Sequence, residues 1–171
     1  SKTYPDKECL GADCTTGVFL QLNMIRAGVE GVYVCHAAEE IGGIGSRGIV
    51  NSYVDYQNND SDINTYPWMD NINAVISFDR LGTTSVVTHQ SLERTCSDIF
   101  GYSLIDILAG QWNLVLDSYG TYTDSMEYAE IVPECTNISV GYYNQHTPRE
   151  TQDVFFALDL LEKLIQADWG R

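Results

Sequence analysis

Acidic residues and one histidine stand where apolar, strand-like stretches of the sequence end, and a further aspartate precedes a helix-like stretch. These five residues are Asp13, Glu39, Glu40, Asp79 and His146. In open α/β sheets, ligands bind at the carboxyl ends of the strands. Adjacent carboxylates repel each other, and burying both is unfavourable unless a cation lies close to them. The pair Glu39 and Glu40 therefore favours a site where one carboxylate binds a metal ion and the other transfers protons.

Each of these residues also has a simpler interpretation when it is considered alone. Asp13 could be a helix N-cap, Asp79 a turn acid at a strand end, and His146 an ordinary surface histidine. Glu39 and Glu40 could be a solvated pair in a loop. Four separate segments that bring Asp, Glu, Asp and His to one edge of a sheet weaken these simpler interpretations together.

The apolar pattern predicts alternating helices and strands around these residues. Strands are predicted at 32–35, 74–78, 85–88, 114–116 and 137–142, and helices at about 15–28, 46–56 and 93–109 and from Thr147 onward. The last helix is predicted from a capping box, with a threonine at the N-cap, proline next and Glu150 at the third helical position. The alternation favours an α/β fold with a mostly parallel or mixed central sheet flanked by helices.

Two of the predicted helices carry apolar residues at helical spacing, which predicts the face that packs on the core. In the first helix these residues are Val18, Phe19, Leu22 and Ile25; in the last they are Val154, Leu158, Leu161 and Ile165, with Trp169 near the end. Cys35, within the predicted strand 32–35, is interpreted as a small core residue.

Length and charge limit the functions that the chain can have. The 171 residues suit a single domain, and 24 acidic against 9 basic residues give a formal charge of −15. Such a charge argues against nucleic acid or an anionic membrane as the main partner, because phosphate binding requires basic residues. It is explained either by solubility or by acids that gather around cations.

Cysteine usage and hydropathy indicate a cellular compartment. The five cysteines are an odd number without a C-x-x-C pair, which favours a reducing environment. No apolar run approaches the ~18 residues of a transmembrane helix, and the polar N-terminus is not typical of a signal peptide. We therefore expect a cytoplasmic protein.

Four successive motifs resemble those of the co-catalytic di-zinc exopeptidases, which include zinc aminopeptidases, carboxypeptidases and deacylases. The motifs are Leu10-Gly11-Ala12-Asp13, Ala38-Glu39-Glu40-Ile41-Gly42, Ser77-Phe78-Asp79-Arg80 and Tyr143-Asn144-Gln145-His146-Thr147-Pro148-Arg149-Glu150. The resemblance implies a zinc-exopeptidase-like fold and an aminopeptidase-like hydrolase that cleaves amide bonds of short peptides or acyl-amino acids. The resemblance is also compatible with a protein that assembles as a homo-oligomer.

The resemblance also assigns a role to each site residue. Asp13 would bridge two zinc ions, Glu40 and His146 would bind one of them, and Asp79 would bind the other. Glu39 would be the general acid and base, a role worth roughly 10²–10⁴ in rate. Carboxylates with one imidazole also suit manganese or cobalt, so the identity of the metal depends on the resemblance.

The sequence departs from the family pattern near its N-terminus. A His-x-Asp motif is expected upstream of Asp13, yet no histidine precedes that residue, and Cys14 stands where an aspartate often follows. Either residues 1–171 are a single catalytic domain that lacks its N-terminal portion, which we favour, or only the Glu40–His146 metal is bound, or the protein is inactive. His36 and His89 could replace the missing ligand, although a structural role suits His36 better and a peripheral position suits His89 better.

Two other function classes compete with the exopeptidase hypothesis. A non-catalytic metal-binding or scaffold protein of the same fold would explain the missing His-x-Asp motif. A nucleotide-binding module is the weakest alternative, because the glycine-rich stretch 42–46 lacks the Gly-Lys-Ser/Thr of a phosphate loop and follows two acids.

Overall fold

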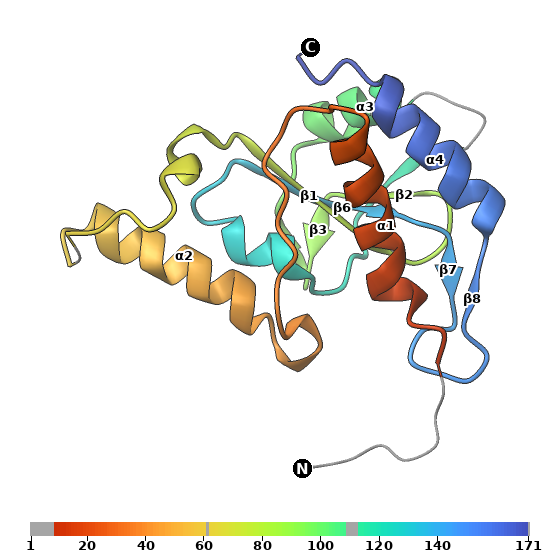
Figure 1. Cartoon of the computed structure of the whole chain (residues 1–171), viewed down its shortest axis with the longest axis horizontal. Helices are drawn as coiled ribbons and strands as arrows, with labels where there is room; N and C mark the ends of the chain where they lie inside the picture. Colours follow the sequence, from red (N-terminus) through yellow and green to blue (C-terminus); the bar gives the residue numbers. More distant parts are fainter. Residues whose placement is uncertain (1–8, 61, 109–112, 171) are drawn as a thin grey trace.

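The computed structural model describes residues 9–60, 62–108 and 113–170. Its α-helices are α1 (Ala12–Arg26), α2 (Ile44–Gln57), α3 (Asp98–Ile107) and α4 (Val154–Gln166), and its 3-10 helices are η1 (Glu39–Ile41), η2 (Pro67–Asn71) and η3 (Asp124–Tyr128). The strands are β1 (Ala74–Arg80), β2 (Ser85–Val87), β3 (His89–Gln90), β4 (Glu93–Arg94), β5 (Val115–Asp117), β6 (Glu134–Ser139), β7 (Tyr142–Tyr143) and β8 (Thr151–Gln152). Figure 1 shows α1 and α4 together on one face of the sheet and α2 projecting to the opposite side of the molecule.

The central sheet has four strands in the order β1-β6-β2-β5. β1 pairs with β6 and β2 pairs with β5 in parallel, whereas β2 and β6 are antiparallel. The predicted α/β fold with a mixed central sheet flanked by helices is therefore confirmed.

Helix α1 packs closely on β1, and this contact sets the position of the first site residue. A Cβ added to Gly17 would lie 2.5 Å from the carbonyl oxygen of Phe78, so only glycine allows this approach. Leu20 and Met24 of α1 enter the main core, where Ile138 of β6 and Leu160 and Leu164 of α4 are also buried. The N-terminal end of α1 is thus held next to the carboxyl end of β1.

The predicted core faces of the first and last helices are wrong. The side chains of Val18, Phe19, Leu22, Ile25, Val154, Leu158 and Ile165 are all exposed, and Leu161 is only partly buried. Leu20 and Met24 are buried in α1, and Phe156, Leu160 and Leu164 are buried in α4. Both helices carry apolar residues on two sides, so spacing alone does not determine which side packs, whereas the small residues of α1 permit the close contact.

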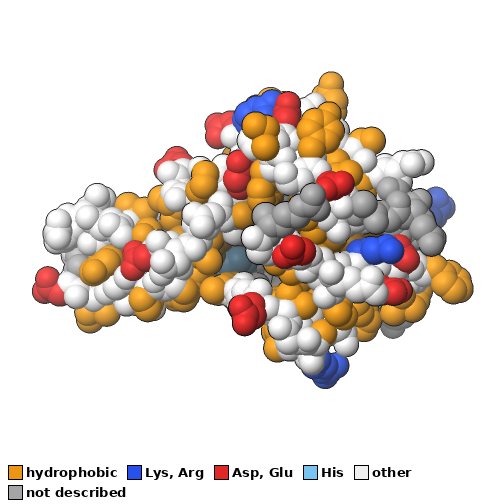
Figure 2. Space-filling view, turned by 90° about the horizontal axis from the view of Figure 1, so that it is seen from above, with side chains coloured by type: hydrophobic (Ala, Val, Ile, Leu, Met, Phe, Trp, Pro, Cys, Tyr) orange, Lys and Arg blue, Asp and Glu red, His pale blue; other side chains and the backbone are white. Residues whose placement is uncertain are grey.

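The predicted strand at 32–35 is also wrong, since this segment forms no strand among the described residues. A cavity of 410 Å³ separates it from β1 and is lined by consecutive residues of both, 29–36 and 74–79. Figure 2 shows the surface hollowed near the middle of one face. A strand needs a hydrogen-bonded neighbour, and β1 is an edge strand whose seven residues are all only partly buried. Cys35 is exposed and does not belong to the core.

The predicted starts of two helices differ from those in the structure. α3 begins at Asp98 with Ser97 as its N-cap, and the residues predicted as its first turn include β4. α4 begins at Val154 with Asp153 as its N-cap. Thr147 instead belongs to a turn, in which the N–H of Glu150 donates to the carbonyl oxygen of Thr147. The capping-box pattern fails because Glu150 binds another part of the chain.

The remaining predicted elements agree with the structure to within a few residues. α2 contains the predicted helix 46–56, and α1 begins three residues before the predicted Thr15. The predicted strand 137–142 is divided into β6 and β7 at Gly141, whose φ of 93° breaks the extended backbone. None of the helices within the described ranges is long and apolar enough to cross a membrane.

Candidate metal and catalytic site

All five residues singled out in the sequence line one cavity of 280 Å³. They come from four places: the first turn of α1, the turn η1, the end of β1 and the loop after β7. The other residues that line the cavity are Gly42, Thr121, Tyr122, Tyr142 and Gln145. The structure therefore brings Asp13, Glu39, Glu40, Asp79 and His146 together, as the sequence predicts.

Asp13 is held at the N-terminus of α1 by the carboxylate of Glu150. The N–H groups of Gly11, Ala12 and Asp13 donate to the two oxygens of Glu150 at 2.7, 2.8 and 3.2 Å. The first turn of a helix leaves such N–H groups without partners, and a negative charge there is favourable. Since Glu150 satisfies them, the side chain of Asp13, only 6% exposed, is available for other contacts.

Glu39 and Glu40 lie in a tight turn that glycines make possible. Ala38, Gly42 and Gly43 have φ of 63°, 99° and 61°, in the left-handed region, and the N–H groups of both glycines donate to the carbonyl oxygen of Glu39. A side chain at Gly43 would collide with the hydroxyl of Tyr122. Burial, followed by the charge of Glu40, raises the pKa of Glu39 above its usual value, which suits a group that accepts and returns a proton.

Asp79 is fixed at the end of β1 by its neighbours in the sheet. Its N–H donates to Oδ1 of Asn137 at 2.9 Å, and its carbonyl oxygen accepts from Asn137 Nδ2 and the Tyr142 hydroxyl. Oδ2 of Asp79 accepts the hydroxyl of Thr123 at 3.1 Å. Burial, and then the negative charge of Glu39, raises the pKa of Asp79 to about 7.

His146 contacts both Asp13 and Glu40. Its Nε2 lies 2.7 Å from Asp13 Oδ2 and 3.0 Å from Glu40 Oε1. Partial burial lowers the pKa of His146. The negative charges of Glu40 and Asp13, and the hydrogen bonds that His146 makes with them, outweigh burial and raise this pKa above its usual value. His146 has a positive φ of 59°, in the left-handed region.

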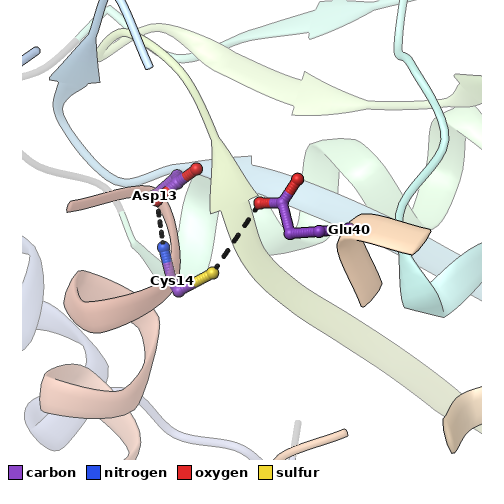
Figure 3. Close-up of side chains that lie close together, drawn as sticks. All are labelled: Asp13, Cys14 and Glu40. Carbon is purple, nitrogen blue, oxygen red and sulfur yellow. Dashed lines mark hydrogen bonds between the residues drawn. The ribbon is translucent and has the colours of Figure 1, made fainter. Parts of the chain in front are cut away.

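Cys14 adds a fourth group that could bind a metal ion. Single ligand atoms of Asp13, Cys14 and Glu40 all lie within 4.8 Å of one another. Figure 3 shows Cys14 next to Asp13 on α1, with its sulfur directed toward Glu40 from η1 across 3.9 Å. Burial, and then the charges of Asp13 and Glu40, raises the pKa of Cys14 to about 12, so the thiol is protonated without a cation.

The donor set fits a divalent cation. The carboxylates of Asp13 and Glu40 converge on the imidazole of His146, and only His146 among the residues that line the cavity offers a positive charge to its four acids. Carboxylate and imidazole ligands suit zinc, manganese or cobalt. Burial, and then the repulsion between the carboxylates, raises the pKa of Asp79 and Glu39, and a bound cation would offset that repulsion.

Neither of the other two histidines takes the place of a missing ligand beside Asp79. Nδ1 of His36 pairs with Asp124 at 3.0 Å, and its Nε2 contacts the Tyr128 hydroxyl at 2.7 Å. Nδ1 of His89 contacts the hydroxyl of Thr88. Among the described residues that line the 280 Å³ cavity with Asp79, His146 is the only histidine, and its Nε2 already contacts Asp13 and Glu40.

The contacts that three residues make in the site could not be predicted from the sequence. Glu150 was predicted to serve its own helix, yet it caps α1 from 139 positions away. Thr123 and Asp124, in a stretch that reads as a loop, contact Asp79 and His36. No local pattern identifies such long-range contacts, although a Thr-Asp pair in a polar loop is typical of residues that bond to backbone or side chains.

The fold is similar to those of two solved structures. One is PhTET1-12s, a dodecamer in the asymmetric unit, with a TM-score of 0.65, 15% identity, and coverage of 94% of this chain and 52% of that one. The other is the aminopeptidase APDkam598 from the archaeon Desulfurococcus kamchatkensis, with a TM-score of 0.52, 19% identity, and coverage of 90% and 46%. The chain thus has an aminopeptidase-like fold and spans about half the length of these proteins. The sequence matches no protein-family model and no curated protein.

Proposed function

We propose that the protein is a metal-dependent hydrolase of the aminopeptidase type that cleaves amide bonds of short peptides or acyl-amino acids. The observation that carries the proposal is the convergence of Asp13, Glu40 and His146, with Nε2 of the histidine in contact with both carboxylates. Glu39 lines the same cavity. The similarity of the fold to an aminopeptidase supports the same chemistry.

Asp13, Glu40 and His146 would hold a zinc ion, with manganese or cobalt as alternatives. Bound zinc polarises a carbonyl and makes water a better nucleophile at neutral pH. Glu39 would accept a proton from the attacking water and give it to the leaving amine, which its raised pKa favours. Asp79 would bind a second zinc ion, although His146, the only histidine among the described residues that line this cavity, would already bind the first.

The substitution Glu39→Gln tests the role of the general base. It keeps the shape of the side chain and leaves Asp13, Glu40 and His146 in place, so zinc content should remain while hydrolysis of aminoacyl p-nitroanilides falls at least ~10²-fold. The exposed Glu93→Gln on β4 is the matched control and should change neither quantity. Unchanged hydrolysis in Glu39→Gln would show that the assignment is wrong.

A second candidate function is a metal-binding protein without catalysis. Among the described residues of the cavity, the one histidine already contacts Asp13 and Glu40, so no second histidine stands beside Asp79, which favours this candidate. Zinc at one equivalent per chain, with no turnover of peptides, esters or acyl-amino acids, would support this candidate and contradict the hydrolase. His146→Ala should abolish zinc binding under either function.

We also propose that residues 1–171 are part of a longer catalytic domain. The 410 Å³ cavity between the edge strand β1 and the apolar segment 29–36 would accept a further strand. The two similar structures are about twice as long as the regions that match this chain. The coding sequence upstream of Ser1 should therefore encode a strand with a His-x-Asp motif, and its absence there would refute this proposal.

The exposed apolar side chains support a homo-oligomer. Val18, Phe19, Leu22 and Ile25 on α1 and Phe155 and Leu158 on α4 are all at least 39% exposed. Apolar patches of this kind mark protein–protein contacts. Light scattering coupled to size-exclusion chromatography should give a mass above one chain, and Leu22→Lys should reduce that mass; a monomer in both cases would contradict the proposal.

A further inference from the structure

Two adjacent residues, Thr123 and Asp124, connect otherwise separate parts of the site. The hydroxyl of Thr123 donates to Asp79 Oδ2 at 3.1 Å, on the side of β1. The carboxylate of Asp124 contacts Nδ1 of His36 at 3.0 Å and accepts the hydroxyl of Ser46 at 2.5 Å. His36 precedes Glu39 by three positions, and Ser46 follows Glu40 by six. Asp124 therefore binds both ends of the turn that carries the two glutamates.

The local backbone explains how neighbouring residues reach opposite sides. Thr123 is the N-cap of η3 and has φ −152° and ψ 170°, an extended conformation. Successive side chains on an extended backbone point in opposite directions. One side chain therefore faces β1, while the next faces the turn 36–46.

Burial shows that these contacts are not solvated surface pairs. Thr123 is 2% exposed and Ser46 is fully buried, and the side chains of His36 and Asp124 are only 10% and 14% exposed. His36 also contacts the buried hydroxyl of Tyr128 through Nε2 at 2.7 Å. A buried carboxylate that accepts two donors is costly to disrupt, because each donor would lose its partner away from water.

The turn itself needs such support. Ala38 has a positive φ of 63°, which is unfavourable for a residue with a side chain. The turn is closed by a bond from the Gly45 N–H to the carbonyl oxygen of Ala37, at 3.0 Å. A Cβ at Gly45 would lie 2.7 Å from that backbone, so the two ends of the turn are already in tight contact.

We propose that Thr123 and Asp124 are a positioning pair, which holds Asp79 with one side chain and the Glu39–Glu40 turn with the other. The proposal rests on the metal-dependent site proposed above. Neither residue is placed in contact with the reacting atoms; both act through the groups that they hold. Residues that orient metal ligands from behind commonly change metal affinity by 10–100-fold when they are replaced.

Ser46→Ala and Ser97→Ala form a matched pair of variants. Each removes one serine hydroxyl that donates to a carboxylate, Asp124 for Ser46 and Glu134 for Ser97 at 2.7 Å, but Ser97 lies at the start of α3 away from the site. Ser46→Ala should raise the zinc dissociation constant about 10-fold and speed hydrogen–deuterium exchange over residues 37–45 about 10-fold. Ser97→Ala should lower the melting temperature and leave both readouts unchanged.

Thr123→Val and Thr123→Ser test the other half of the pair. Valine keeps the shape but loses the hydroxyl, so zinc affinity should fall by about 10-fold, whereas serine restores the donor and should keep the wild-type value. Equal zinc affinity in all four variants, with unchanged exchange over residues 37–45, would overturn the proposal. If the protein binds no zinc, the hydrogen–deuterium exchange rates over residues 37–45 alone test the positioning role. Glu39→Gln tests the proposed hydrolysis independently of these rates.

Discussion

The raised pKa of Asp79 predicts how the stability of the metal-free protein depends on pH. The pKa of this carboxyl is about 7, against 3.8 for an ordinary aspartate, mainly because it is buried and then because Glu39 lies nearby. A carboxyl with a raised pKa in the folded state binds its proton more tightly there than in the unfolded chain. Its protonation therefore stabilises the fold at low pH, and this contribution is lost as the pH rises through 7.

The two pKa values give the magnitude of the effect. At pH 8 the carboxyl is ionised in both states and contributes almost nothing. At pH 5.5 the carboxyl is protonated in the folded state and ionised in the unfolded one. Protonation then raises the equilibrium constant for folding by a factor of about 30, which corresponds to about 2 kcal/mol. The raised pKa of Glu39 acts in the same direction as that of Asp79.

Urea unfolding at pH 5.5 and pH 8 with a chelator measures the difference directly. The wild type should be more stable at pH 5.5, and Asp79→Asn should lose about 2 kcal/mol of that difference because its side chain does not titrate. Asp98→Asn, whose side chain is 57% exposed on α3, is the control and should behave as the wild type. The same pH dependence in the wild type and in Asp79→Asn would refute the assignment of a raised pKa to this carboxyl.

Three further predictions follow from contacts around the site. Glu150→Gln should lower the free energy of unfolding by about 1–2 kcal/mol, because it removes the negative charge that accepts three N–H groups at the start of α1. Chemical denaturation measures this free energy, and an unchanged value would contradict the capping role. Gly17→Ala should destabilise the fold by about 1–3 kcal/mol, since the new methyl group would lie 2.5 Å from the Phe78 carbonyl oxygen, whereas the same change at the open position Gly48 should not. Zinc at about 100 times its dissociation constant should stabilise the fold by about 2.7 kcal/mol in thermal unfolding, and a similar shift in His146→Ala would exclude the proposed ligand set.

The location of the site could be predicted from the sequence because it depends on where segments end. Glu39, Glu40 and Asp79 follow apolar stretches, and the approximate ends of those stretches were enough to place them at one edge. An error of three residues in the start of α1 does not move Asp13 away from its first turn. The roles assigned to these residues stay predictions, since contact between side chains does not establish chemistry.

The packing faces of the helices could not be predicted in the same way. α1 has apolar residues on both sides, so the spacing of Val18, Leu22 and Ile25 was as regular as that of the residues that pack. The deciding feature was Gly17, whose missing side chain lets the helix approach β1. The role of Glu150 was hidden for a related reason, because its partners lie 137–139 positions away along the chain.

The unpaired edge of β1 leads to a prediction about backbone exchange. In a parallel sheet, alternate residues of a strand direct their N–H groups to opposite neighbours, so only half of those in β1 can bond to β6. The other half face the 410 Å³ cavity and the segment 29–36, which forms no strand. Hydrogen exchange resolved by residue should therefore alternate along β1 between slow and fast positions. The amides of residues 32–35 should exchange fast, whereas those of β6 should exchange slowly because β6 has a neighbouring strand on each side. Uniform protection of β1 would mean that another strand already covers this edge in solution, and the description of β1 as an open edge would then be wrong.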